Sequence, residues 1–141
     1  MANSGNVDIA LIGKLTGDAT LMGLAPGGVF REIAPQGATE PYVIVQMMRH
    51  SDEYLINRGE AFEEFTYMVK AVQRNTSGAT VQSVADRIHT LLQDGTMTIT
   101  GYNLTTMQRE ERIAYVELDE NRDQRYQHRG GLYQVLVEPT A

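Results

Sequence analysis

The chain has 141 residues, a net charge of −6, no cysteine and no tryptophan. The absence of cysteine excludes disulfides, thiolate metal sites and cysteine catalysis. The acidic balance makes the chain a poor candidate for wrapping nucleic acid, which requires clustered cations.

The length predicts one domain that spans residues 1–141. No apolar run approaches the roughly 20 residues that a membrane-spanning helix needs, and the N-terminus lacks the basic region of a signal peptide. We therefore expect no membrane association and a cytoplasmic location. Arginine outnumbers lysine ten to two. This bias favours protein–protein ion pairs, because the planar guanidinium binds carboxylates in a fixed geometry.

Two short helices are expected to open the chain. Apolar residues recur at helical spacing between Val7 and Leu15, and Gly17 should end this first helix. Asp18 should cap a second short helix, which Pro26-Gly27-Gly28 closes.

The next third of the chain predicts strands. Residues Val29 to Ile33 form a short strand, and the loop from Ala34 to Ala38 follows, with a proline and a glycine that fix a rigid turn. Tyr42 to Arg49 carries apolar residues on both faces and should be a central strand. His50 to Glu60 is polar and is predicted to be a long hairpin loop, and Ala61 to Gln73 should return as a strand.

The clearest element is the helix that follows the turn at Asn75-Thr76-Ser77-Gly78. Its apolar residues form a single stripe at helical spacing: Val81, Val84, Ala85, Ile88, Leu91 and Leu92. We expect this stripe to pack on the sheet residues Val43, Val45 and Val69.

Beyond Thr96 the apolar residues alternate. Strands are expected over Thr96 to Leu104, Gln108 to Leu118 and Tyr126 to Glu138, with a charged loop from Asp119 to Arg125. The resulting order, α-α-β-β-β-α-β-β-β, predicts an α+β fold. In this fold an antiparallel or mixed sheet of about five to six strands carries the helices on one face.

Few residues offer catalytic or metal-binding chemistry. His89 lies at the edge of the helical stripe and should pack there, while His50 and His128 lie at strand–loop boundaries without a second imidazole nearby in sequence. The run from Asp119 to Asp123 matches the first five positions of a calcium loop, but Gln124 stands where glycine is required. We therefore expect no catalytic residue, no metal site and no cofactor.

Positive charge is concentrated in one place, at Arg122, Arg125, His128 and Arg129. Three interpretations remain open for this group. It can be a solvated hairpin, a docking surface for an acidic partner or, least favoured, a nucleic-acid site, because the neighbouring carboxylates cancel most of the field.

Several short motifs resemble those of one family: Asp18-Ala19-Thr20-Leu21, Val29-Phe30, Ala34-Pro35-Gln36-Gly37-Ala38, Pro41-Tyr42-Val43 and Tyr133-Gln134-Val135. In these motifs and in its order of elements, the chain resembles the tail-terminator (tail-completion) family of long-tailed bacteriophages. The resemblance implies a structural protein of the virion tail-neck region, present in the host cytoplasm during assembly, with no enzymatic activity.

The same resemblance implies a ring of six copies that caps the completed tail tube and ends its polymerisation. The partners would be the tail tube protein and a head-completion or neck protein, and DNA would pass through the lumen without specific binding. Two alternatives remain: another neck component, such as a head-closure or connector protein, and a small enzyme or ligand-binding domain.

A ring subunit must present two different surfaces that fit each other. The polar loop from His50 to Glu60 and the hairpin from Asp119 to Arg129 carry partly complementary charges and are the expected contact segments. The candidate contact residues are Asp52, Glu53, Arg58 and Glu60 on the first, and Arg122, Arg125 and Arg129 on the second.

Overall fold

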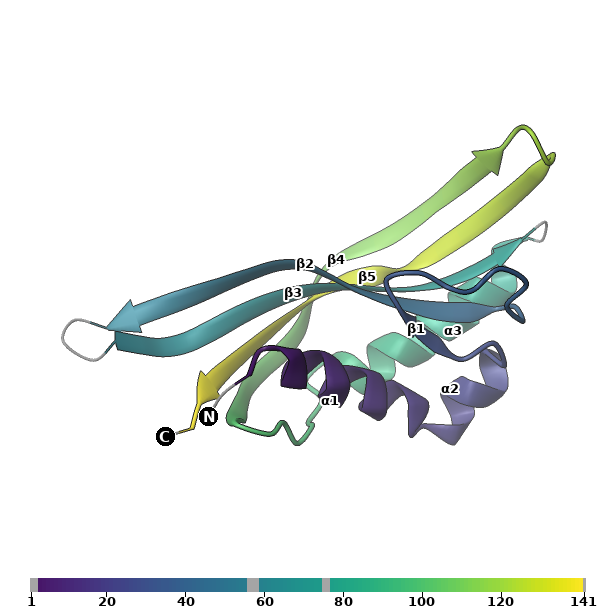
Figure 1. Ribbon diagram of the computed structural model, residues 1–141. Coiled ribbons are helices and arrows are strands. Elements are labelled where there is room, and N and C mark those ends of the chain that lie inside the picture. The colour runs from purple at the N-terminus through teal and green to yellow at the C-terminus, as the bar shows by residue number, and fades with distance from the viewer. Residues whose placement is uncertain (1–2, 56–58, 75–76, 141) are drawn as a thin grey trace.

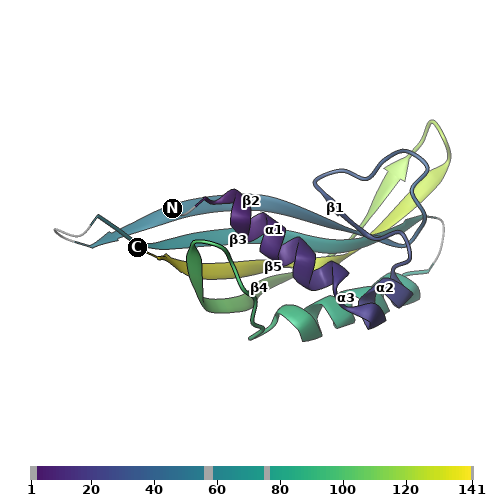
Figure 2. The same cartoon turned by 60° about the horizontal axis from the view of Figure 1, so that its bottom comes forward.

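The computed structural model describes residues 3–55, 59–74 and 77–140. These residues form one sheet with three helices on one of its faces (Figures 1 and 2), so the α+β prediction is confirmed. The elements in chain order are α1 (Gly5–Thr16), α2 (Ala19–Leu24), β1 (Val29–Arg31), β2 (Tyr42–Leu55), β3 (Gly59–Arg74), α3 (Ala79–Leu92), β4 (Tyr102–Asp119) and β5 (Gln124–Pro139).

The sheet is mixed, and its strand order is β1-β2-β3-β5-β4. Strand β1 runs parallel to β2, while the other three pairs are antiparallel. β3 is therefore the middle strand, and the two long hairpins β2–β3 and β4–β5 lie side by side through the β3–β5 pair. None of the described helices is long and apolar enough to cross a membrane.

The helix-bearing face of the sheet holds the core. The predicted stripe of α3 is buried, with Val81, Val84, Ile88 and Leu92 fully covered, and it belongs to the same cluster as Val43, Val45 and Val69. α3 packs mainly on β3 and β5, whereas α1 lies across β2 and β3 in Figure 2. The sequence therefore identified the buried face of α3 correctly, although Leu91 of the predicted stripe is only partly buried, and α1 and α3 cover different parts of the sheet.

Asp18 links helix α2 to helix α3. Its carboxylate accepts a hydrogen bond from the Leu21 amide at 2.8 Å, as an N-cap of α2 should. Arg87 of α3 donates two more, from Nε at 2.9 Å and from Nη2 at 2.8 Å. The Arg87 guanidinium and the Leu21 amide lower the pKa of Asp18 to about 2.

The loop before β2 is fastened at its C-terminal end, next to the strand. Gly37 has a φ of 82°, in the left-handed region that the sequence predicted for a glycine here, and the Glu40–Pro41 peptide bond is cis. The Glu40 carboxylate accepts hydrogen bonds from the Arg74 amide at 2.6 Å and from Arg74 Nε at 2.5 Å. The loop is thus held against the end of β3.

Two predicted boundaries are wrong. The segment from His50 to Glu60 is mostly strand, because β2 continues to Leu55 and β3 begins at Gly59. Most of the segment from Thr96 to Leu104 is not strand: β4 begins at Tyr102, after a turn in which Gly101 has a φ of 85°. Ile99 is nevertheless buried, because this irregular segment folds under the sheet and covers one end of the core.

Replacing Ile88 with alanine should lower the free energy of unfolding by about 2–5 kcal/mol, because the side chain is fully buried between α3 and the sheet. Ile9→Ala is the matched control: Ile9 is 63% exposed on α1, so its loss should change stability by less than about 0.5 kcal/mol. Urea denaturation followed by circular dichroism measures both. Equal effects of the two substitutions would show that the assigned core face of α3 is wrong.

Replacing Asp18 with asparagine should lower the melting temperature at pH 7. The lowered pKa means that the carboxylate stabilises the fold above pH 4, and that this contribution is lost as the pH falls towards 2. The difference between wild type and variant should therefore close between pH 4 and pH 2. An Arg87→Gln background should reduce the difference at pH 7, and an unchanged difference there would contradict the assigned ion pair.

Candidate functional site

Two hairpins extend beyond the helical layer and point in opposite directions (Figure 1). We call the outer part of the first, from Gln46 through the turn to Phe65, the β2–β3 arm. The outer part of the second, from Glu110 to Gly131, is the β4–β5 arm. The base of each arm includes buried residues such as Phe65 and His128, whereas its outer part exposes many side chains that are available for contacts with other molecules.

The β2–β3 arm is held in register by antiparallel pairing along its length, with irregularities at Met48 and between Glu53 and Tyr54. Carboxylates outnumber cationic side chains on its described part: Asp52, Glu53, Glu63 and Glu64 against Arg49 and His50. Arg58 lies outside the described residues. Glu60 lies in β3, but its side chain is not among the described ones.

The arm also exposes apolar and aromatic side chains: Met47, Met48 and Tyr54 are 44%, 52% and 66% exposed.

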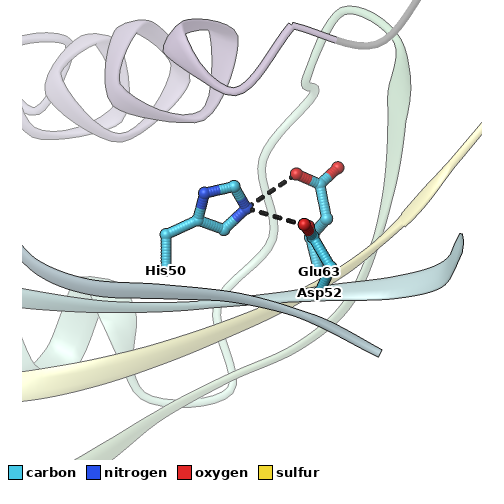
Figure 3. Close-up of side chains that lie close together, drawn as sticks. All are labelled: His50, Asp52 and Glu63. Atoms are coloured by element: carbon cyan, nitrogen blue, oxygen red, sulfur yellow. Dashed lines mark hydrogen bonds and ion pairs between the residues drawn. The ribbon is translucent and has the colours of Figure 1, made fainter. Parts of the chain in front are cut away.

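Three side chains converge near the base of this arm (Figure 3). His50 Nε2 lies 2.7 Å from Glu63 Oε1 and 3.4 Å from Asp52 Oδ1. Asp52 and Glu63 are direct cross-strand partners, and the His50 ring stacks on Phe65 with centroids 4.3 Å apart. The Glu63 side chain is only 6% exposed, so this carboxylate depends on a close cationic partner.

The β4–β5 arm ends in a turn that carries both signs of charge. The sequence places Arg122 and Arg125 at this tip together with Asp119, Glu120 and Asp123, and Arg122 Nε lies 4.0 Å from the Asp119 carboxylate. The Asp119 carboxylate also accepts a hydrogen bond from the Arg122 amide, as in an ordinary turn. Along β4 the arm exposes Tyr115, Val116 and Leu118, at 43%, 48% and 60%.

Two glycines lie where the β4–β5 arm leaves the body. A Cβ atom at Gly130 would lie 2.0 Å from the Val69 carbonyl oxygen, and one at Gly131 would lie 2.9 Å from Arg109 Cδ. Gly130 therefore requires glycine, because the backbone of β3 approaches it closely, whereas at Gly131 the nearest atom belongs to the flexible Arg109 side chain. The sequence showed this pair as an isolated doublet, and its role at the base of the arm became clear only from the strand register.

The predicted basic group is divided by the fold. Arg129 lies in β5 and donates a hydrogen bond from Nη1 to Gln82 of α3 at 2.9 Å. His128 points to the opposite face, is 6% exposed and contacts Glu117 at 3.0 Å. Burial lowers the pKa of His128. Only Arg122 and Arg125 of the group are exposed at the tip, so only these two remain together as candidate contact residues.

The face of the sheet opposite the helices has its own partly buried polar contacts. Lys70 of β3 donates a hydrogen bond to the Tyr115 hydroxyl at 2.6 Å, and the Tyr115 ring stacks on His128. Beside them lies an open hollow of about 660 Å³, lined by Tyr42 and Val72 and by the outer part of the β4–β5 arm. These contacts tie the base of the arm to the sheet.

His89 behaves as the sequence predicted. It packs at the edge of α3, with Nδ1 3.2 Å from the Tyr133 hydroxyl. Burial lowers the pKa of His89, and the nearby Arg109 and Arg112 act in the same direction. The imidazole is therefore a packing group between α3 and β5.

The fold and the sequence can be compared with known proteins. In its fold the chain is similar to a chain from the structure titled "Virion of native gene transfer agent (GTA) particle", with a TM-score of 0.71 and 18% identity over 97% of this chain and 98% of that one. No curated protein sequence matches it. The family model described as "Tail completion protein gp17" matches residues 9–138.

The chain is therefore a structural protein of bacteriophage tails. It belongs to the tail-completion gp17 family, whose model covers nearly its whole length. The resemblance expected from the short sequence motifs is confirmed, and the family is one of structural proteins rather than enzymes.

Replacing Gly130 with alanine should lower the free energy of unfolding by about 1–3 kcal/mol, because the added methyl group overlaps the backbone of β3. Gly13→Ala is the matched control, since a Cβ at this helical position meets nothing within 4 Å. The control should be neutral or stabilising by up to about 1 kcal/mol. Thermal unfolding measures both, and a Gly130→Ala protein as stable as wild type would contradict the close strand approach.

Proposed function

We propose that this protein completes the phage tail by assembling as a closed ring of six copies on the end of the tail tube. The ring ends polymerisation of the tube and presents the surface that joins the head. The proposal rests on membership of the tail-completion family together with one structural observation, the two arms at opposite ends of the sheet.

Arms at opposite ends suit a ring because each subunit then offers two different surfaces. In a head-to-tail contact, one arm of a subunit meets the other arm of its neighbour, and the contacts close when the rotation per subunit divides a full turn. The opposite direction of the arms therefore supports the predicted contact segments as subunit contacts.

The charges of the arms support the same arrangement. The described part of the β2–β3 arm is rich in carboxylates, and Glu53 is exposed there, while Arg122 and Arg125 lie at the tip of the other arm. Exposed apolar side chains on both arms, such as Tyr54 and Leu118, can be covered in such a contact. Interfaces of this kind combine an apolar centre with a charged rim.

The partners in this proposal are the tail tube protein on one side of the ring and a head-completion or neck protein on the other. DNA passes through the lumen without specific binding, and the net charge of −6 is consistent with a channel that does not retain it. The protein acts in the virion tail-neck region after assembly in the host cytoplasm.

The second candidate is another neck component, such as a head-closure or connector protein, which would also use projecting arms. Binding to purified tail tubes discriminates the two: a terminator binds the open tube end directly, and a head-closure protein binds the head portal complex. A small enzyme or ligand-binding domain is the least supported class, because the matched family is structural.

The double substitution Arg122→Glu and Arg125→Glu should leave the subunit folded and impair capping. Exposed changes usually cost within about 0.5 kcal/mol of stability, whereas reversed charges at a rim oppose association. The matched control is Lys14→Glu with Arg31→Glu, which makes the same change of net charge on α1 and β1. Complementation of a phage that lacks this gene, with electron microscopy of tail length, measures the effect. Normal tails with the tip variant would count against the tip as a contact.

A charge exchange tests whether the arms meet each other. Glu53→Arg and Glu60→Arg on the β2–β3 arm should restore capping to the tip variant if the two arms pair between subunits. Rescue would identify the arms as mutual partners. Failure of rescue, with each variant folded, would instead assign the tip to the tail tube or to the neck protein.

A further inference from the structure

The convergence of His50, Asp52 and Glu63 goes beyond the structural role of the family. An imidazole nitrogen and two carboxylate oxygens, one from each residue, all lie within 4.8 Å of one another. His50 and Asp52 are two residues apart on β2, so both side chains point to the same face, and Glu63 reaches this face from the paired strand. Three donors on one face of a hairpin supply three of the four ligands of a tetrahedral site.

The spacing of these donors fits a small divalent ion. A tetrahedral zinc site with ligand distances of about 2.0–2.2 Å places its donor atoms roughly 3.3–3.5 Å apart. His50 Nε2 and Asp52 Oδ1 are 3.4 Å apart, and His50 Nε2 and Glu63 Oε1 are 2.7 Å apart. The second distance is about 0.6 Å below this range, as in a direct hydrogen bond, so the Glu63 carboxylate must move away from the imidazole when an ion is bound.

The surroundings favour a bound cation at this point. Asp52 and Glu63 face each other directly across the hairpin, an arrangement in which two like charges repel. Glu63 is almost fully buried, so water cannot screen it. A divalent ion compensates both carboxylates at once, whereas a protonated imidazole supplies only one positive charge to the pair.

The imidazole is also held in place for coordination. Its ring stacks on Phe65 with an interplanar angle of 6°, which fixes the ring plane while Nε2 points to the carboxylates. The stacking limits rotation of the ring, so Nε2 stays directed at the two carboxylates. Mixed imidazole and carboxylate donors select zinc and similar first-row ions over calcium and magnesium, which prefer oxygen donors alone.

We propose that His50, Asp52 and Glu63 bind a divalent first-row metal ion, with zinc as the preferred ion and water completing the coordination shell. The sequence alone predicted no metal site, and this proposal departs from that prediction. The site ties β2 to β3 where the arm leaves the helical layer, so a bound ion stiffens the base of the arm. The proposal does not depend on ring formation, because the ligands all come from one subunit.

The chain contains a matched control for this site. His128 contacts Glu117 at 3.0 Å, but this histidine–carboxylate pair has no second carboxylate within ion-pair distance in the described residues. A single imidazole and one carboxylate should bind zinc far more weakly than three donors. His128→Ala therefore removes a histidine without removing the proposed site.

The experiment uses the full chain after treatment with a chelator. Titration with Zn²⁺ by isothermal calorimetry should give one site per chain, and Co²⁺ in place of Zn²⁺ should give visible absorption bands of a four-coordinate ion. Asp52→Asn, at an exposed position with little effect on folding, should weaken binding about tenfold or more, and His50→Ala should do the same. His128→Ala should bind as wild type, and Mg²⁺ should not compete.

The melting temperature provides an independent measure of zinc binding. Zn²⁺ should raise it in wild type and in His128→Ala, and should leave it unchanged in Asp52→Asn and His50→Ala, because only binding to the folded state stabilises. Zinc binding that is equal in Asp52→Asn and wild type would overturn the proposal. So would the absence of saturable binding to a folded wild-type chain, which would assign the cluster to a histidine–carboxylate ion pair alone.

Discussion

The strands of this protein are much longer than the helices that cover them, and the other features depend on this mismatch. Strands of 14 to 18 residues extend over roughly 46–60 Å at about 3.3 Å per residue. Helices of 12 and 14 residues are only about 18 and 21 Å long at 1.5 Å per residue. The helical layer covers the middle of the sheet, so the remaining strand length must project as arms.

The same mismatch explains what the sequence could and could not predict. The buried stripe of α3, the cap at Asp18 and the strand at Tyr42 follow from periodicity and turn chemistry, which act wherever one face is buried. The segment from His50 to Leu55 belongs to a hairpin that stands largely outside the helical layer. In such a segment polar side chains are tolerated on both faces, so apolar and polar residues do not alternate. The sequence of the segment then cannot be distinguished from that of a loop.

The candidate sites were harder to predict than the core for a related reason. His50 and Asp52 share a face through their spacing in sequence, but their partner Glu63 depends on the register of a hairpin whose turn length was overestimated. The need for glycine at Gly130 likewise depends on β3, whose backbone lies close beside it. Contacts across strands cannot be predicted until the register is known, whereas contacts along one helix can.

The border of the covered sheet also determines which charges can act in assembly. The basic residues between Arg122 and Arg129 form one group in the sequence. In the structure, some of them lie where the helical layer covers the sheet and others lie beyond it. Inside this border, Arg129 ties the arm to Gln82 of α3 and His128 contacts Glu117 of the same hairpin, so these side chains are used within the subunit. Beyond it, two strands have no helix to cover them, and side chains such as Arg122 and Leu118 remain exposed. A hairpin of this kind has marginal stability alone, so ties at its base are needed if its tip is to meet a partner in a fixed position.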